Sequence, residues 1–221
     1  MEKHVLVIFP HPDDEAFGTA GVMTKFIKDG VPVTYACATL GEMGRNMGNP
    51  FFATRETLPE VRKEELLNAC KAMGVEDLRM LGFRDKTLEF EDSELLVSTI
   101  GGLIDELKPS LIITFYPGHG IHPDHDACAH AVVEAVKRIP SNNRPTVYGL
   151  PITPDREEVL GKPDRVYDVT DVMETKIKTI EAHRSQTEAM VPRLKDGTLD
   201  LNSDMLKFIK QESFWIYPFT Q

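Results

Sequence analysis

The sequence has few cysteines, no long apolar run and no excess of positive charge. Its three cysteines, Cys37, Cys70 and Cys128, are odd in number and widely spaced, which argues against a disulfide framework or a CxxC metal site and favours a reducing cytoplasm. No apolar run approaches the roughly 18 residues of a membrane helix, and the run before Pro10 is too short for a secretory signal. The net charge of −10 argues against a nucleic-acid partner, because binding to phosphate chains depends on clustered Lys and Arg. We expect a soluble cytoplasmic protein that binds neither membranes nor nucleic acid.

The length and composition predict an ordinary globular domain. The chain has 221 residues, of which 41% are hydrophobic and 27% are charged. This length suffices for one large α/β domain with a hydrophobic core but is short for two domains of typical size. We therefore expect a single domain over 1–221.

Short apolar segments alternate with segments of helical spacing. The short segments are rich in β-branched or aromatic residues and are bounded by Gly, Pro or charge, so they predict strands. They are 4–9, 33–40, 78–83, 110–116, 146–152 and 165–170. The helical spacing predicts helices that end at Gly30 and Gly74, a helix over 93–108, one after an HPDH motif and one that opens at Asp171. The alternation predicts an α/β fold with a mostly parallel, twisted, Rossmann-like sheet and helices on both faces.

Two segments lack a clear period. Segment 41–57 contains three glycines and a proline, and structureless loops of this length are usually lids or binding loops. The tail after 190 combines a glycine turn at 195–200, a short helix and the sequence WIYPF. We expect the tail to pack back on the body.

Two polar clusters follow the first and the fourth predicted strands. His11, Asp13 and Asp14 lie in an HPDDE motif after the first strand, and His122 and His125 lie in HPDH after the fourth. In a strand order 3-2-1-4-5 the first and fourth strands are neighbours at the switch point, where ligands bind beyond the carboxyl ends of the strands. We therefore expect the two clusters to open into one crevice.

Two histidines and one carboxylate are typical ligands of catalytic zinc, which keeps a fourth position open for a water. His11, Asp14 and His125 could supply this set. Adjacent Asp13 and Asp14 cannot point the same way from an extended backbone, so we predict that Asp13 is the general base. His122 lies one helical turn from His125 and, as a cation, would stabilise an oxyanion or protonate a leaving amine. The same ligands also describe the facial triad of non-haem iron enzymes, so Fe²⁺ stays open beside Zn²⁺.

The motifs HPDDE, HPDH and AHRSQ (182–186) together resemble the PIG-L (LmbE-like) family of zinc-dependent N-acetylglucosamine deacetylases. The resemblance extends from residue 11 to about 186 and implies an LmbE-like fold. It also implies a small acetylated amino sugar as substrate and a trimer or hexamer as assembly. Within the family, the chain most resembles the members that remove acetate from N-acetylglucosaminyl malate in bacillithiol biosynthesis. The implied zinc ligands are His11, Asp14 and His125, with Asp13 as base and His122 beside the tetrahedral intermediate.

The resemblance implies further site residues and shows one departure. Arg62 of VRKEEL and Asp85 of GFRDKT are implied in holding sugar hydroxyls, and Asp124 is implied in orienting a histidine. Relatives that act on mycothiol precursors carry Tyr two residues before HPDH, where this chain has Gly120. His119 is the candidate to replace that Tyr.

Several charged residues have two readings. Arg45, Arg55 and Arg62 lie in or near the long loop and would suit a substrate that carries carboxylates, such as malate, although exposed loop arginines are commonplace. His183 of AHRSQ lies near the site or is an ordinary buried histidine of an amphipathic helix. Glu15 either takes part in the chemistry or makes supporting contacts to the site or to the helix N-terminus.

Three alternative functions remain open from the sequence. The first is a deacetylase of chitooligosaccharides or of another N-acetylglucosamine conjugate, and the second is an amidase of thiol conjugates. The third is a metal-binding module without turnover, which would have no use for Asp13 and His122.

Overall fold

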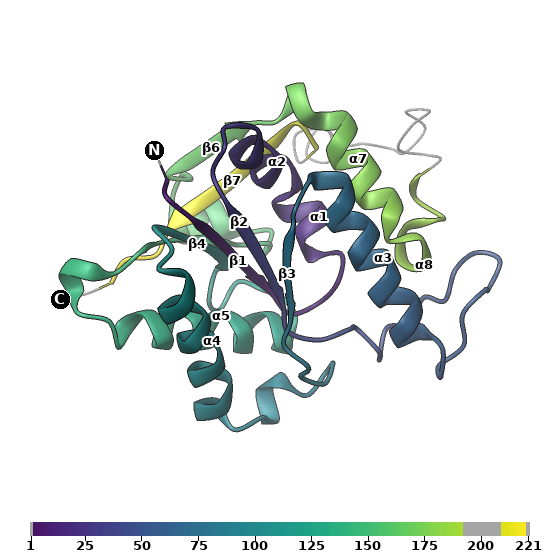
Figure 1. The fold of residues 1–221 in the computed structure, drawn as a ribbon, viewed down its shortest axis with the longest axis horizontal. Coiled ribbons are helices and arrows are strands. Elements are labelled where there is room, and N and C mark those ends of the chain that lie inside the picture. Colours follow the sequence, from purple (N-terminus) through teal and green to yellow (C-terminus); the bar gives the residue numbers. More distant parts are fainter. Residues whose placement is uncertain (1, 192–208, 220–221) are drawn as a thin grey trace.

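The structure, a computed structural model, describes residues 2–191 and 209–219. Within these residues the strands form one seven-stranded sheet in the order β3-β2-β1-β4-β5-β7-β6 (Figure 1). The strands are β1 (Val5–Phe9), β2 (Val33–Cys37), β3 (Asp77–Met80), β4 (Leu111–Phe115), β5 (Thr146–Leu150), β6 (Arg165–Asp168) and β7 (Gln211–Ile216). The order of the first five strands confirms the predicted 3-2-1-4-5 arrangement.

The sheet is parallel from β3 to β5 and antiparallel at its other edge. β1 pairs with β2 and with β4, β2 with β3, and β4 with β5, all in parallel. β7 pairs antiparallel with both β5 and β6. The sequence predicted only that the tail, which contains Trp215, packs on the body of the protein. In the structure, β7 of the tail lies in the sheet between β5 and β6, which both precede it in the chain. The predicted turn at 195–200 lies outside the described residues.

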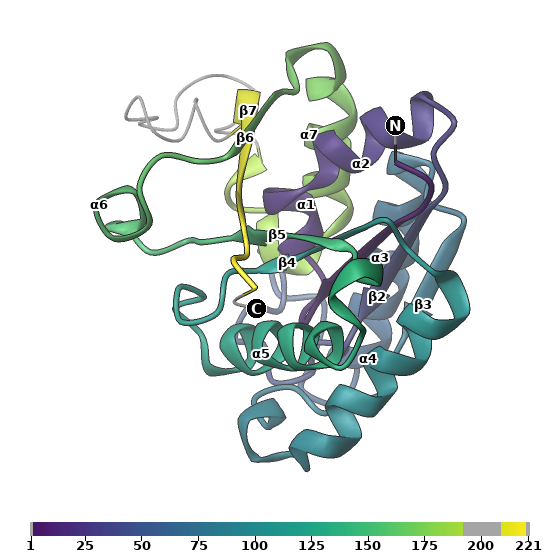
Figure 2. The ribbon, with the colours of Figure 1, turned by 90° about the vertical axis from the view of Figure 1, so that its left-hand side faces the viewer.

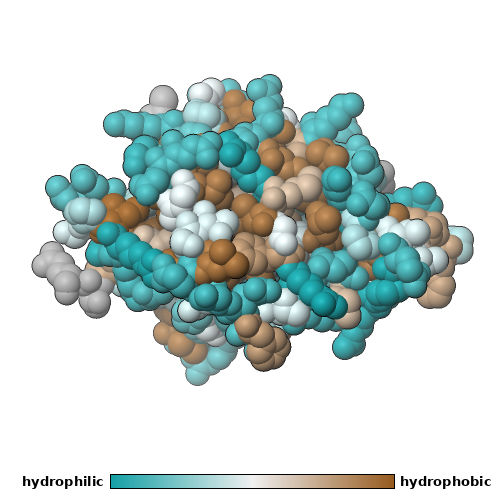
Figure 3. Space-filling model, turned by 60° about the horizontal axis from the view of Figure 1, so that its bottom comes forward, coloured by the Kyte–Doolittle hydropathy of each residue, from teal (hydrophilic) through white to brown (hydrophobic). Residues whose placement is uncertain are grey.

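Helices cover both faces of the sheet, as predicted. They are α1 (Asp14–Gly18), α2 (Ala20–Lys28), α3 (Leu58–Met73), α4 (Ser93–Leu107), α5 (Pro123–Lys137), α6 (Arg156–Leu160), α7 (Met173–Ala182) and α8 (Arg184–Thr187). α2, α3 and α7 lie on one face, and α4 and α5 lie on the other (Figures 1 and 2). Figure 3 brings the α4 and α5 side forward, where hydrophobic residues lie in separate groups between hydrophilic ones.

The central strands are buried on both faces, which explains their continuous apolar sequence. Alternate residues of β1 enter different cores because successive side chains of a strand point to opposite faces. Val5 and Val7 pack with residues of α2 and α3, whereas Leu6 and Ile8 pack with residues of α4 and α5. The first strand is therefore fixed from both sides, and the residues that follow it start from a rigid position.

Several predicted boundaries were wrong. Strands predicted over 33–40 and 78–83 end at Cys37 and Met80, and the remaining residues leave the sheet. The helix expected to open at Asp171 begins at Met173 after a 3₁₀ turn. Asp171 forms an ion pair with Lys25 at 2.7 Å instead of capping the helix. In the described part of the chain, helices fall short of the length and apolarity that crossing a membrane requires.

Candidate active site

The predicted site residues converge beyond the carboxyl ends of β1 and β4. His11, Asp13 and Asp14 follow β1, and His122 and His125 follow β4. They share a cleft of about 400 Å³. The residues that line it are His11, Asp13, Asp14, Gly44, Arg45, Arg62, Asp85, Lys86, His122 and His125. Sequence-distant clusters thus meet in one crevice, as the strand order predicts.

Three of these side chains direct ligand atoms at one point. Nδ1 of His11 lies 3.2 Å from Nε2 of His125 and 3.6 Å from Oδ2 of Asp14. Oδ1 of Asp14 lies 3.4 Å from Nε2 of His125. Ligands about 2.0–2.1 Å from a tetrahedral zinc ion are about 3.3–3.4 Å from one another. The spacing of these atoms therefore fits the predicted ligand set, with one oxygen of Asp14 toward each histidine.

The orientation of His11 is fixed by buried carboxylates on its other side. Nε2 of His11 lies 3.1 Å from Oδ2 of Asp124 and 3.1 Å from Oδ1 of Asp85. The Asp124 carboxylate also accepts hydrogen bonds from the backbone N–H groups of Lys86 at 2.6 Å and Leu88 at 3.2 Å. Because the Nε2 proton faces these carboxylates, Nδ1 is left for a cation in the cleft. This geometry agrees with the implied orienting role of Asp124.

His125 is oriented in the same manner by the backbone. Its Nδ1 lies 2.8 Å from the carbonyl oxygen of Gly120, so the Nδ1 proton is donated there and Nε2 faces the cleft. The ring also stacks on Phe115, with ring centroids 4.0 Å apart. A Cβ atom on Gly120 would lie 2.5 Å from Cβ of His125. A side chain at position 120 would therefore force His125 or the loop before it to shift.

The charges of the cluster call for a cation. Burial opposes protonation of His11, yet hydrogen bonds to Asp124, Asp14 and Asp85 raise its pKa well above the ordinary value. Burial likewise opposes ionisation of Asp14, but His125 and His11 hold its pKa below the usual range. The cluster thus favours a positive charge between these ligand atoms, a place that a divalent cation can take.

Asp13 lies beside the ligand cluster in an unusual backbone conformation. Its φ of 103° falls in the left-handed region, which non-glycine residues rarely adopt. The predicted extended backbone is wrong here, because Asp13 is the N-cap of α1 and Asp14 is already its first residue. The Arg62 guanidinium contacts Oδ2 of Asp13 at 3.1 Å. Burial, partly offset by Arg62, raises the pKa of Asp13 to about 6, which is suitable for a general base.

His122 is the N-cap of α5. Its Nδ1 accepts a hydrogen bond from the backbone N–H of Asp124 at 3.1 Å. An acceptor nitrogen carries no proton, so this geometry favours a neutral ring with its proton on Nε2. The predicted cationic form does not fit this hydrogen bond. As a neutral donor, His122 could still face an oxyanion in the cleft.

The residues implied in sugar binding lie in the cleft but are strongly engaged by the protein. Arg62 donates to the carbonyl oxygens of Gly41 and Pro12 as well as to Asp13. Asp85 accepts from the backbone N–H of Met43 at 2.8 Å. Both side chains are buried. Their contact with a substrate stays a prediction, and the geometry assigns both a second task within the site.

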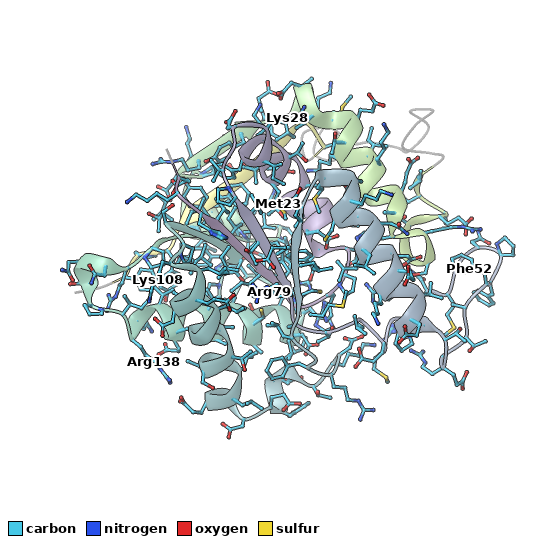
Figure 4. The ribbon with its side chains drawn as sticks, viewed as in Figure 1. Met23, Lys28, Phe52, Arg79, Lys108 and Arg138 are labelled. Atoms are coloured by element: carbon cyan, nitrogen blue, oxygen red, sulfur yellow. The ribbon has the colours of Figure 1, made fainter. Side chains whose placement is uncertain are left out.

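Other predicted participants lie elsewhere. Nδ1 of His119 lies 2.8 Å from Oγ1 of Thr153, and His119 is absent from the described lining of the cleft. Arg55 donates hydrogen bonds to the carbonyl oxygens of Glu42 and Gly44. These bonds connect two parts of the long loop. Figure 4 shows Phe52 on this loop, far from the sheet.

Three buried residues lie behind Asp13; the sequence left Glu15 and His183 open between two readings and did not single out Tyr35. Glu15, Tyr35 and His183 are all 0% exposed. Glu15 bonds to the hydroxyl of Tyr35 at 3.0 Å and to Nε2 of His183. Burial opposes protonation of His183, but Glu15 raises its pKa, which favours a buried ion pair. The AHRSQ motif was the only signal for His183, and nothing in the sequence pattern pointed to Tyr35.

Comparison with known proteins identifies the family. The profile of the PIG-L family, described as GlcNAc-PI de-N-acetylase, matches residues 6–136, which include both motifs of the cleft. The chain belongs to this family. A protein of Bacillus subtilis named "Probable N-acetyl-alpha-D-glucosaminyl L-malate deacetylase 2" is 55% identical over 217 residues, 98% of each chain. A diacetylchitobiose deacetylase of Thermococcus kodakarensis is 31% identical, with 83% of this chain and 70% of that protein covered.

Solved structures agree with this fold assignment. The N,N'-diacetylchitobiose deacetylase of Pyrococcus horikoshii, solved with an inhibitor, has a TM-score of 0.73 and 26% identity over 98% of this PIG-L chain and 84% of its own. The 4-carboxy-2-hydroxymuconate hydratase GalB has a TM-score of 0.72 at 16% identity, covering 99% and 98% of the two chains. The second similarity shows the fold alone, because one fold can carry different reactions.

Proposed function

We propose that this PIG-L protein hydrolyses the N-acetyl group of N-acetylglucosaminyl malate with the help of a divalent metal, and that it acts in bacillithiol biosynthesis. The observation that carries the chemistry is the convergence of the ligand atoms of His11, Asp14 and His125 beside a carboxylate of raised pKa on Asp13. The substrate is taken from the relatives of about 50% identity whose names specify this malate conjugate.

His11, Asp14 and His125 would hold the metal, which when bound supplies a Lewis acid for the acetyl carbonyl and a more acidic water. Asp13 takes a proton from the attacking water. Arg62 contacts the carboxylate of Asp13, and both residues line the cleft. The Nε2–H group of His122 donates a hydrogen bond to the developing oxyanion. The C–N bond then breaks, the amine takes up the proton that Asp13 accepted from the water, and the products are acetate and a free amino sugar.

Two cationic side chains favour an anionic substrate in a cleft that also holds Asp13, Asp14 and Asp85. Arg45 and Lys86 line it in a protein whose net charge is −10. Nζ of Lys86 donates to the carbonyl oxygen of Met43 at 2.9 Å, a neutral partner that leaves the charge of Lys86 in place. Two cations beside the ligand cluster would suit the carboxylates of malate. An uncharged chitooligosaccharide would make no such use of them.

The reaction and the substrate can be tested in one assay. Acetate release by the zinc-loaded protein is measured with N-acetylglucosaminyl malate and with N-acetylglucosamine at equal concentration. The proposal predicts a strong preference for the malate conjugate. Equal or reversed rates would be consistent with deacetylase activity but would contradict the malate conjugate as substrate. If diacetylchitobiose, assayed in parallel, is the better substrate, the alternative suggested by the Thermococcus relative is favoured.

Four finer parts of the proposal concern the native metal, the assembly, the domain and the location. We propose zinc as the native metal, which elemental analysis of anaerobically purified protein tests against iron. We propose a trimer or hexamer, as the family resemblance implies, and light scattering measures its mass. We also propose a single domain over 1–221 and a cytoplasmic location; the location is supported by three cysteines that are all free and buried.

A further inference from the structure

We propose that Glu15 is a positioning residue that holds Asp13 in its left-handed conformation, and that Tyr35 and His183 clamp Glu15 for this purpose. The inference rests on the proposed role of Asp13 as the base. Glu15, Tyr35 and His183 would then form a buried hydrogen-bond network that extends from the cleft to the AHRSQ motif.

Asp13 is anchored at three separate groups. Its backbone N–H donates to Oε2 of Glu15 at 3.0 Å. Its carbonyl oxygen accepts from the backbone N–H of Ala16 at 3.0 Å, which starts α1. Its side chain contacts Arg62. A residue with φ of 103° persists only when its surroundings hold it there. Of the three anchors, only Glu15 bonds to the backbone N–H of Asp13, and the unusual angle φ is the rotation about the bond from this nitrogen to Cα.

Both carboxylate oxygens of Glu15 are engaged. Its Oε2 accepts from the Tyr35 hydroxyl at 3.0 Å as well as from Asp13, and its Oε1 pairs with Nε2 of His183. These partners come from β2, from the start of α1 and from the junction of α7 and α8. Because the side chains of Glu15, Tyr35 and His183 are fully buried, we expect a change in any of them to shift the backbone of Asp13.

The arrangement differs from a buried ion pair that only ties elements together. The chain contains such a pair at Glu212, which bonds to the backbone N–H groups of Gly21 and Val22 and to Nζ of Lys176. Both glutamates are buried, accept from backbone N–H and pair with a basic side chain. Only Glu15 bonds to a residue of the cleft. Glu212 therefore provides a matched control.

The test compares Glu15→Gln with Glu212→Gln, using N-acetylglucosaminyl malate as substrate and zinc-loaded protein. For Glu15→Gln we expect kcat to fall between about 10- and 100-fold, as small misplacements of reacting groups do. KM, zinc stoichiometry and far-UV circular dichroism stay close to those of the wild type. For Glu212→Gln we expect a lower melting temperature and an unchanged kcat. Equal effects of the two variants on kcat would overturn the proposal.

A double-mutant cycle separates positioning from a general loss of structure. If Glu15 acts through Asp13, then Glu15→Gln should have almost no further effect on kcat in an Asp13→Asn background. Independent, multiplicative losses would contradict the inference. Should Glu15→Gln fail to fold, Tyr35→Phe removes one donor to Glu15 at nearly constant shape and should show the same non-additivity with a smaller loss. A wild-type protein that releases no acetate would refute the proposed function, whereas an active wild type with additive variants would refute only the positioning role.

Discussion

Replacing Asp124 by Asn should weaken metal binding without touching a metal ligand. Asp124 is fully buried and accepts three hydrogen bonds, from Nε2 of His11 and from the N–H groups of Lys86 and Leu88. An Asn side chain has one acceptor oxygen, so its NH₂ group must face one of these donors. Loss of the carboxylate behind a ligating histidine typically reduces metal affinity about 10- to 100-fold, which corresponds to about 1.4–2.7 kcal/mol. The buried mismatch should in addition lower the free energy of unfolding by about 1–3 kcal/mol.

The assay is a competition titration of zinc between the protein and a chromogenic chelator, for the wild type, Asp124→Asn and Asp85→Asn. Asp85 also lies 3.1 Å from Nε2 of His11, but that nitrogen has one proton, and Asp124 already accepts it. We therefore expect a smaller loss for Asp85→Asn than for Asp124→Asn. Unchanged zinc affinity in Asp124→Asn, with the protein still folded, would refute the argument that this carboxylate orients His11.

Three further outcomes follow from the structure. Gly120→Ala should reduce zinc affinity in the same titration, because the new Cβ would lie 2.5 Å from Cβ of His125; wild-type affinity would contradict this packing. Glu15 raises the pKa of buried His183 against the effect of burial, so the stability that this pair adds is fully present below about pH 6.5 and is lost as the pH rises through the raised pKa. Urea unfolding should thus show the difference between wild type and His183→Gln shrinking at high pH, and a growing difference would count against the pair. Removing the metal with a chelator should lower the melting temperature, since free zinc at about 1,000 times its Kd adds about 4 kcal/mol to the folded state.

The parallel half of the sheet and the meeting of the two motifs could be predicted from the sequence. β1 and β4 are continuous apolar segments because both faces of the central strands are covered, and each is followed directly by histidines and carboxylates. Once the order 3-2-1-4-5 is assumed, His11 and His125 must come close. These predictions rest on local patterns and on one topological rule.

The features that escaped prediction depend on contacts between distant parts of the chain. β7 was not predicted as a strand. Its Glu212, at an inward position, is buried and contacts the backbone of α2 and Lys176 of α7, and local sequence does not reveal these contacts. The left-handed backbone of Asp13 depends on its neighbours and not on its own preference. Tyr35 looks like any other residue of a buried strand until Glu15 is placed beside it.

The most direct test of the central claim is acetate release from N-acetylglucosaminyl malate by zinc-loaded wild type and zinc-loaded Asp13→Asn, each with its zinc content measured. The account predicts a rate roughly 10²–10⁴-fold lower for Asp13→Asn at equal zinc content. A fully zinc-loaded Asp13→Asn that releases acetate at nearly the wild-type rate would contradict it.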